Sequence, residues 1–294
     1  MRVPPAAGFL APALAALGLF FFAPVAAALL LSLTDFDLYA IGDPGALRVT
    51  GTRNYQRLLA DPAFWTALRN TLYFVVVGGP LSVAVSLAGA LLVHARATRL
   101  RGFFRTVYFL PVVTTLVAVA IVWRALYHPR VGPLAELSRA LGLPVIDWLG
   151  DARFAMPAII LMAVWKNFGF NLVIFLAGLQ AIPERLYEAA RIDGASAWQQ
   201  LRWVTLPMLG PTFLFVSLST AIGYFQLFAE PYVMTNGGPS DATLSIVLLM
   251  YREGFRWWNL GYAAAVAFVL FLLILLVSLL QLRLRRADAL GGPA

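Results

Sequence analysis

The segment Glu188–Pro211, EAARIDGASAWQQLRWVTLPMLGP, determines how the rest of the chain is interpreted. It is polar, whereas the segments before and after it are apolar for about the length of a membrane-spanning helix. Pro183 suits the first turn of a short helix because it has no backbone N–H to donate. Asp193 and Gly194 favour the end of that helix, since glycine readily adopts the left-handed conformation found there.

A second short helix is expected directly after the first. Ser196 stands three residues before Gln199, the spacing at which each side chain can bond the free backbone N–H of the other. The helix is expected to run from Ala197 to about Thr205 and to end before Pro207, because the residue before a proline disfavours helical geometry. The segment therefore predicts a helix–turn–helix that lies outside the bilayer.

Composition assigns the chain to the integral membrane proteins. Hydrophobic residues make up 61% and charged residues 12% of the sequence, and the mean hydropathy is +0.80. Soluble domains carry about 25% charged residues. The absence of cysteine excludes disulfides, thiolate metal sites and cysteine nucleophiles. The net charge of +8 is attributed to arginines near anionic headgroups and on cytoplasmic loops, and no nucleic-acid partner is expected.

Apolar segments predict an all-α integral membrane protein with six transmembrane helices in one domain, residues 1–294. Each segment is long enough to cross a hydrocarbon core that needs about 20 helical residues. The first is interpreted as a span rather than a cleaved signal peptide, because its apolar run is too long for a simple h-region. The predicted spans are residues 8–33, 71–94, 106–127, 155–179, 208–233 and 260–282.

Arginines orient these spans. The segment between the second and third spans carries four arginines and no acid, which places it in the cytoplasm by the positive-inside rule: Arg96, Arg99, Arg101 and Arg105. Six spans then put both termini in the cytoplasm, with residues 34–69, 128–154 and 234–259 outside. Within 34–69, two short helices are expected, near Asn54–Leu59 and near Phe64–Leu68.

Nothing in the sequence predicts an enzyme. The single lysine, Lys166, does not follow a glycine-rich loop, so there is no Walker A site. His94 and His128 lie at opposite ends of the second and third spans, and no metal site is expected. Acidic residues lie almost entirely in loops, which argues against buried carboxylate pairs.

Polar residues within two spans indicate a pathway. Lys166, Asn167, Phe170 and Asn171 share one face of the fourth span, where a charge is costly unless it faces water or a partner. They either line a translocation pathway or make polar contacts between helices, and Lys166 either contacts substrate or pairs with a partner helix. A second face, in the fifth span, carries Thr220, Gly223, Tyr224 and Leu227.

Three motifs of the opening segment resemble the EAA loop of inner-membrane permease subunits of binding-protein-dependent ABC importers. They are Glu188-Ala189-Ala190, Asp193-Gly194-Ala195 and Leu206-Pro207. Thr235–Pro239, TNGGP, and Gly261–Ala265, GYAAA, resemble the carbohydrate branch, the maltose, lactose and glycerol-3-phosphate permeases.

The resemblance implies the type I importer architecture, with residues 183–207 as the loop that couples to the ATPase. Implied partners are a homologous second permease, two cytoplasmic ATPase subunits that bind ATP and Mg, an extracytoplasmic solute-binding protein and a sugar-like substrate. This chain would hold no cofactor and lie in a bacterial or archaeal inner membrane. A stand-alone secondary transporter or channel is the alternative, although no internal repeat supports it.

The resemblance also implies a sugar pocket. Matched position by position, the family's pocket falls on Ala163, Lys166, Asn167 and Phe170 of the fourth span and on the named face of the fifth. Ala163 and Leu227 have no hydrogen-bonding side chain, which departs from a maltose-like pocket. Glu230 is expected at the membrane interface, and a role in substrate entry is the alternative.

Overall fold

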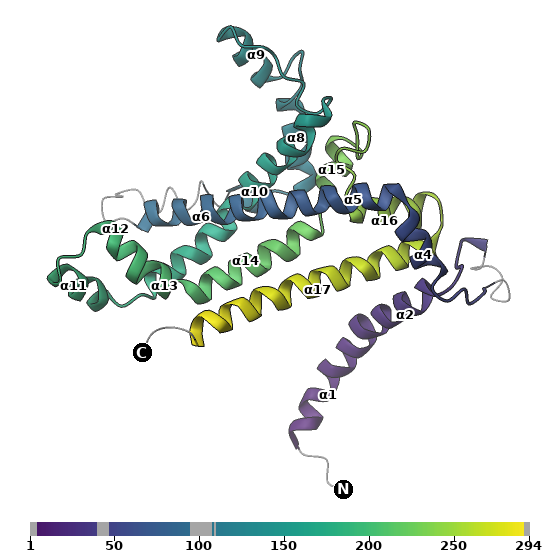
Figure 1. Cartoon of the computed structure of the whole chain (residues 1–294), viewed down its shortest axis with the longest axis horizontal. Helices are drawn as coiled ribbons and strands as arrows, with labels where there is room; N and C mark the ends of the chain where they lie inside the picture. The colour runs from purple at the N-terminus through teal and green to yellow at the C-terminus, as the bar shows by residue number, and fades with distance from the viewer. Residues whose placement is uncertain (1–4, 40–46, 95–107, 109, 291–294) are drawn as a thin grey trace. The chain divides into compact units, whose positions relative to one another are not determined.

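The structure is a computed structural model that describes residues 5–39, 47–94, 108 and 110–290, without the side chains of 5–8 and 285–290. The regular elements of these residues are helices, apart from one isolated bridge between Thr34 and Val49 (Figure 1). The chain forms two compact units, residues 1–65 with 246–273 and residues 66–245 with 274–294. Each is described by itself, and the expectation of one domain stays a prediction.

Four described helices are long and apolar enough to cross a membrane: Phe9–Ser32, Pro62–His94, Ala152–Gln180 and Leu260–Leu284. Ala197–Met208 and Gly210–Phe225, which meet at a bend of 67°, make a fifth candidate if they count as one span. The chain is therefore an all-helical membrane protein with four to five candidate spans among its described residues.

The third predicted span is only partly described. Its described portion ends in α8 (Leu116–Leu126), which is preceded by a helical break at Thr114 and Thr115. Residues 95–107 and 109, with the four arginines that orient the spans, lie outside the described residues.

The first unit contains α1 (Pro5–Leu17), the π-helix η1 (Gly18–Phe22), α2 (Ala23–Ser32), α4 (Arg53–Ala60), α16 (Ile246–Tyr251) and the π-helix η5 (Arg252–Arg256). It also contains the beginnings of α5 (Pro62–Tyr73) and α17 (Leu260–Leu290). The short helix predicted near Asn54–Leu59 is confirmed as α4. Residues 234–259, expected to be a loop, instead include α16, because its apolar side chains are buried.

The separate helix predicted near Phe64–Leu68 is wrong. These residues belong to α5, which begins at Pro62 and continues through the π-helix η3 (Phe74–Gly78) into α6 (Gly79–His94). Asp61 starts this helix, since its Oδ1 accepts a hydrogen bond from the backbone N–H of Ala63 at 2.9 Å. Pro62 follows directly at the first helical position, where its missing N–H costs nothing.

A polar cluster ties the elements of the first unit together. The Glu253 side chain is 5% exposed, and its Oε2 accepts hydrogen bonds from Arg57 at 3.4 Å and Asn259 at 2.8 Å. The Arg57 guanidinium lies 4.1 Å from the centre of the Tyr262 ring. The Tyr262 hydroxyl donates to Asp61 Oδ2 at 2.7 Å. The cluster thus joins α4 to the starts of α5 and α17.

Tyr262→Phe is expected to destabilise the first unit. The change removes a hydrogen bond to a carboxylate, of a kind that contributes about 1.5–3 kcal/mol. Thermal unfolding in detergent should show a lower Tm by several degrees. Tyr39→Phe is the matched control because the Tyr39 side chain is exposed; an equal Tm for the two variants would contradict a stabilising role for the cluster.

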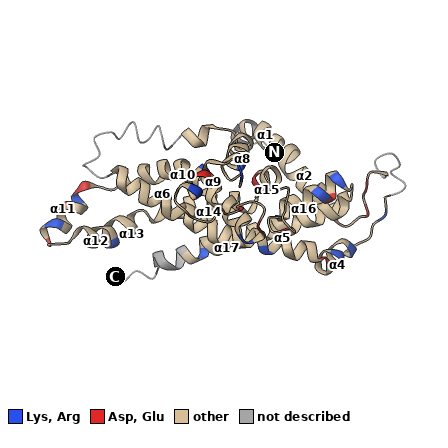
Figure 2. Ribbon diagram, turned by 90° about the horizontal axis from the view of Figure 1, so that it is seen from above, with Lys and Arg blue, Asp and Glu red and all other residues tan. Residues whose placement is uncertain are grey.

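The second unit packs α10 (Ala152–Gln180) against α6 and α14 (Gly210–Phe225). Figure 2 shows these ribbons almost free of charged residues, as an apolar surrounding requires. A buried cluster fills the space between them, formed by Val83, Ala90, Leu172, Phe175, Leu179, Ile182, Leu209 and Val216. Gly89 lets α6 approach α10, since a Cβ there would lie 2.6 Å from the Phe168 ring.

The fifth predicted span, 208–233, differs from the structure at its end. Helix α14 stops at Phe225, residues 226–228 are not helical, and α15 (Ala229–Met234) follows. Pro231 explains the break, because its ring would clash with the carbonyl of Leu227 in a continuous helix. That carbonyl instead accepts a hydrogen bond from the Ser245 hydroxyl.

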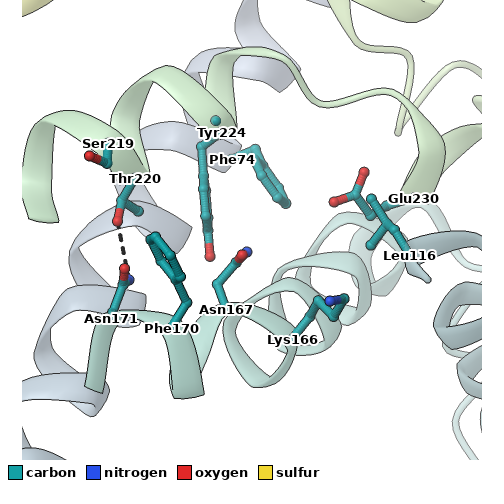
Figure 3. A pocket seen from close by; sticks show the side chains of 11 residues that line it. Phe74, Leu116, Lys166, Asn167, Phe170, Asn171, Ser219, Thr220, Tyr224 and Glu230 are labelled. Atoms are coloured by element: carbon teal, nitrogen blue, oxygen red, sulfur yellow. Dashed lines mark hydrogen bonds between the residues drawn. The ribbon is translucent and has the colours of Figure 1, made fainter. Parts of the chain in front are cut away.

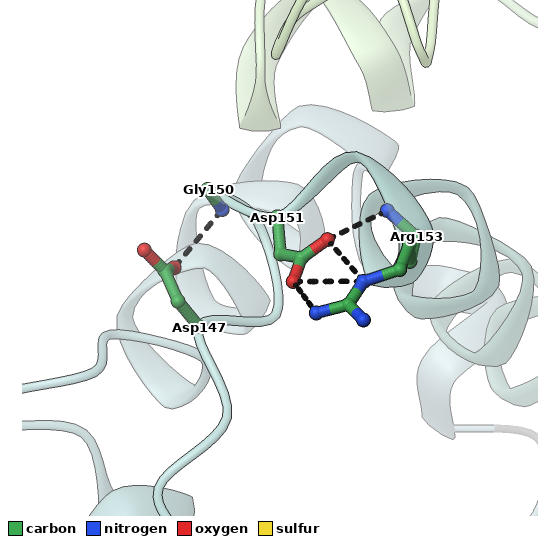
Figure 4. A network of polar contacts seen from close by, with 4 residues as sticks. All are labelled: Asp147, Gly150, Asp151 and Arg153. Carbon is green, nitrogen blue, oxygen red and sulfur yellow. Dashed lines mark hydrogen bonds and ion pairs between the residues drawn. The ribbon is translucent and has the colours of Figure 1, made fainter.

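Asp151 caps the N-terminus of α10. Its carboxylate accepts hydrogen bonds from the backbone N–H of Arg153 at 2.9 Å and from the Arg153 guanidinium at 2.6 Å (Figure 4). The preceding turn is closed by Asp147, which accepts from the Gly150 N–H at 2.9 Å. The Arg153 hydrogen bonds lower the pKa of Asp151 to about 2.

Acid is expected to loosen the first turn of α10. Because the folded-state pKa is depressed, the stability from Asp151 is present above the unfolded value of about 4 and is lost as the pH falls through about 2. Amide exchange at Arg153 and Phe154 should therefore be less protected at pH 2 than at pH 5. Asp151→Asn keeps a capping oxygen but cannot ionise, so the same pH dependence in that variant would contradict this assignment.

Candidate functional site

A cavity of about 300 Å³ lies in the second unit, between α10 and α14, with walls also from η3, α8 and α15 (Figure 3). Its lining residues are Phe74, Leu116, Lys166, Asn167, Phe170, Asn171, Ser219, Thr220, Gly223, Tyr224 and Glu230. Seven of them come from the two faces predicted from the sequence: Lys166, Asn167, Phe170, Asn171, Thr220, Gly223 and Tyr224. The structure thus brings the two faces together around one space.

Ala163 and Leu227, also predicted in the pocket, do not line the cavity. Both are buried, at 1% and 2% exposure. Ala163 lies one turn before Asn167 and contributes its backbone, since its carbonyl accepts a hydrogen bond from Asn167 Nδ2 at 3.0 Å. Leu227 lies in the helical break before α15. In a continuous helix it would share a face with Tyr224, but the break places it elsewhere.

One wall of the cavity is an amide held between three helices. Asn171 is 3% exposed, and its Nδ2 donates to Thr220 Oγ1 at 3.1 Å and to Ser82 Oγ at 3.4 Å. These contacts join α10 to α14 and α6. Because both donors of the amide are engaged, its position is fixed within the cavity wall.

An aromatic wall meets this amide wall. The Tyr224 ring packs on Phe74 with ring centres 4.7 Å apart. Gly78 makes room for it, because a Cβ there would lie 2.9 Å from Tyr224 Cε1. The Tyr224 hydroxyl points toward Asn167 (Figure 3) and, although buried, has no hydrogen-bond partner with good geometry among the described residues. A buried hydroxyl of this kind is costly unless a ligand or water completes it.

The other end of the cavity is charged. Lys166 Nζ donates to the carbonyl of Val112 at 3.1 Å, and Glu230 is 9% exposed. The Val112 carbonyl is available because Thr115 has extended backbone geometry, with ψ 141°, and breaks the helix there. An intramembrane lysine is tolerated when it meets such a carbonyl. Its observed contact is therefore within this chain.

Four cavity residues were not predicted from the sequence: Phe74, Leu116, Ser219 and Glu230. Glu230 has a readable signal, since it is an acid within an apolar run, but the sequence favours the interface and leaves a role in substrate entry as the alternative. Ser219 directly precedes Thr220 on α14, but it lay outside the chosen face. Phe74 and Leu116 are apolar, and only the tertiary packing brings them to the cavity.

The helix–turn–helix at residues 183–207 is present. Helix α11 (Glu184–Ile192) ends at Asp193 and Gly194, as predicted, and Gly194 has φ +78°. Its last carbonyls are satisfied by a Schellman pattern, in which Gly194 N–H bonds Arg191 O and Ala195 N–H bonds Ala190 O. The turn between the helices is therefore fixed by the backbone.

The second helix begins as predicted but does not end before Pro207. Ser196 and Gln199 form the capping box at the start of α12 (Ala197–Gln200). The helix continues through the π-helix η4 (Leu201–Thr205) into α13 (Leu206–Met208). The wider π turn explains the correction, because the Leu206 N–H bonds Leu201 O and the hydrogen-bond register shifts ahead of Pro207.

The loop is exposed on one side and anchored on the other. Ala189 is exposed with Glu188, and Ala190 is half-buried; Asp193, Gly194, Leu206 and Pro207 are exposed and Ala195 is half-buried. On the inner side, Leu186 and Tyr187 pack against the buried cluster of α10 and α14. The Tyr187 hydroxyl also lies 2.9 Å from Thr205 Oγ1, which joins α11 to η4. The loop therefore contacts the helices that form the cavity, and a displacement of the loop would act directly on them.

The sequence model of the family described as "binding-protein-dependent transport system inner membrane component" matches residues 81–287. The chain belongs to this family. It is a permease subunit of a binding-protein-dependent ABC importer, a multi-pass inner-membrane protein and not an enzyme. A stand-alone secondary transporter or channel, the alternative from the sequence, is not supported by this membership.

This permease is similar to curated importer subunits over most of its length. It is 37% identical to the lactose transport system permease protein LacF of Rhizobium radiobacter, over 95% of this chain and 93% of the relative. It is 32% identical to the sn-glycerol-3-phosphate transport system permease protein UgpA of Agrobacterium fabrum, over 90% and 89%. It is 36% identical to the trehalose/maltose transport system permease protein MalF of Thermococcus litoralis, over 72% and 70%.

The fold of the permease is also found among solved structures. A chain of a bacterial alginate ABC transporter, solved in complex with an alginate pentasaccharide-bound periplasmic protein, matches with a TM-score of 0.78. The match covers 94% of this chain and 92% of the other at 21% identity. Identity at that level shows the importer permease fold and leaves the substrate open.

Proposed function

We propose that this permease imports a carbohydrate, that the cavity is part of its translocation pathway, and that residues 183–207 couple it to an ATPase. The observation that carries the proposal is the cavity itself. It combines the fixed amides of Asn167 and Asn171, the buried Tyr224 hydroxyl beside Asn167 and the ring of Phe170, which is half exposed. Sugars are recognised by hydrogen bonds to their hydroxyls and by aromatic rings against their apolar faces. The relatives named for lactose and for trehalose and maltose transport support the same class.

The proposed assembly follows the family. Six transmembrane spans with both termini in the cytoplasm would form half of the pathway, and a homologous second permease would form the other half. Two cytoplasmic ATPase subunits would bind ATP and Mg, and an extracytoplasmic binding protein would deliver the solute across a bacterial or archaeal inner membrane. The motifs of the loop, Glu188–Ala190, Asp193–Ala195 and Leu206-Pro207, would contact the ATPase, and the packing of the loop on the cavity helices would transmit movement.

Uptake in vesicles tests this proposal. Vesicles should contain the permease with its neighbouring-gene products, and the panel should include labelled lactose, maltose, trehalose, arabino-oligosaccharides and sn-glycerol 3-phosphate. We expect ATP-dependent uptake of at least one of them, and its loss in Glu188→Arg. Glu136→Arg, in an exposed position of α9 (Pro133–Ala140), is the matched control and should keep wild-type uptake. Uptake driven by an ion gradient without ATP, or uptake of none of the panel, would overturn the proposal.

A further inference from the structure

The cavity has two chemically different ends. Asn171, Ser219 and Thr220 form an uncharged end, whereas Lys166 and Glu230 lie on the opposite side of the space (Figure 3). Tyr224 lies between the two ends. Among the described residues that line the cavity, Lys166 and Glu230 are the two with charged side chains.

Lys166 keeps hydrogen-bonding capacity that the protein does not use. An ammonium group has three N–H donors, and the Val112 carbonyl, at 3.1 Å, engages one of them. This contact also limits where the ammonium can move, because the carbonyl belongs to the backbone at the helix break. The cavity therefore contains a positioned cation with donors left for a ligand.

Glu230 supplies the opposite charge. Its residue is 9% exposed, and the backbone N–H groups of Phe228 and of Glu230 itself lie within hydrogen-bonding range of its carboxylate. Glu230 and Lys166 line the same end of the cavity. The charged end thus combines one fixed acceptor group with one fixed donor group and has no net charge.

Such an end matches a neutral polyol better than an anion. A hydroxyl both donates and accepts, so neighbouring hydroxyls of a sugar can donate to the carboxylate and accept from the ammonium. A phosphate or carboxylate on the sugar would be attracted by Lys166 but repelled by Glu230. It would also lose its hydration with no net attraction to compensate. Selectivity of this kind comes from a repulsive group as much as from an attractive one.

We infer that the substrate is a neutral polyhydroxylated carbohydrate, and that Glu230 is the specificity-determining residue that rejects sugar phosphates and uronic acids. The inference rests on the proposed carbohydrate function and narrows its substrate class. It separates this permease from the relative named for sn-glycerol-3-phosphate transport and from the alginate transporter of the same fold.

Binding to the purified importer complex without its binding protein tests the inference, because selectivity then resides in the membrane part. Equilibrium dialysis should compare matched labelled pairs, galactose with galacturonate and maltose with maltose 6′-phosphate. We expect the wild-type complex to bind the neutral member of a pair at least tenfold more tightly. Glu230→Gln should reduce that ratio at least tenfold by strengthening binding of the anion, whereas Glu230→Asp, which keeps the charge, should preserve the preference for the neutral sugar.

Lys166→Gln provides a second test that does not depend on the folding of the Glu230 variants. It should weaken binding of both members and raise the preference for the neutral sugar, because the carboxylate is left uncompensated. Glu136→Gln, on α9, is the control and should leave the ratio unchanged. The inference would be overturned, but not the proposed function, if the wild type bound neutral and anionic sugars equally. The same holds if the neutral-to-anionic binding ratio were unchanged in both Glu230→Gln and Lys166→Gln. Absence of any saccharide binding together with absence of carbohydrate uptake would overturn the proposed function and the inference with it.

Discussion

Gly194→Arg abolishes ATP-dependent uptake while the permease remains in the membrane; this is the largest effect that we expect from a single substitution. Gly194 has φ +78°, a conformation that costs other residues roughly 1–2 kcal/mol. A Cβ there meets no atom of this chain within 4 Å, so the chain itself has room for a side chain. The added bulk projects from the exposed turn where the ATPase is proposed to dock, and it would prevent that contact.

Two further variants distinguish a loss of ATPase docking from a loss of folding. Gly194→Asn should retain most uptake, because asparagine tolerates the left-handed conformation and adds little bulk. Gly142→Arg is the matched control, since Gly142 also has a positive φ, +68°, and open space at its Cβ, but lies in the turn after α9. Membrane insertion is checked by fractionation and ATPase association by co-purification. Wild-type uptake and association in Gly194→Arg would contradict the coupling role of the loop.

Gly78→Ala is expected to lower uptake about tenfold because it disturbs the aromatic wall of the cavity. Its Cβ would lie 2.9 Å from Tyr224 Cε1, closer than packed atoms normally approach, and 3.4 Å from Ile160 Cγ2. The Tyr224 ring would have to move off Phe74, on which it packs at 4.7 Å between ring centres. Overpacking of this kind costs roughly 1–3 kcal/mol, which corresponds to about 5- to 150-fold in affinity. We therefore expect a raised KM for the transported sugar, with assembly retained.

Gly79→Ala is the matched control for this experiment. Gly79 is the next residue and is also buried, but a Cβ there meets nothing within 4 Å. Because both substitutions add one methyl group to the same helix, their propensity effects are similar. Uptake kinetics should show a raised KM in Gly78→Ala alone. The same KM in both variants would show that Tyr224 does not need the space that Gly78 leaves.

Local signals in the sequence predicted the loop best. The Schellman end at Gly194 and the capping box at Ser196 depend on residues within one or two turns, so their residue types determine them. Pro207 illustrates the limit of local reasoning. Proline usually ends a helix, but here a π turn before Pro207 shifts the hydrogen-bond register. No residue pattern in the sequence predicts that turn.

The cavity depends on packing that a one-dimensional pattern does not contain. Helical spacing placed Lys166, Asn167, Phe170 and Asn171 on one face of α10, and all four line the cavity. Leu227 was misplaced, although Pro231 gave a visible reason for α14 to stop before it. The position of Glu230 requires the tertiary structure, because its burial follows from how α15 packs against α8.

Thiol labelling in the cavity tests the central claim most directly, that the carbohydrate passes through this space. The chain has no cysteine, so Ser219→Cys provides a single reporter on the cavity wall, and Ser138→Cys in α9 provides a control outside it. In the assembled importer, the transported sugar should slow modification of the Ser219→Cys variant at least fivefold and leave the control unchanged. Equal modification rates with and without a sugar that the same vesicles import would contradict the account.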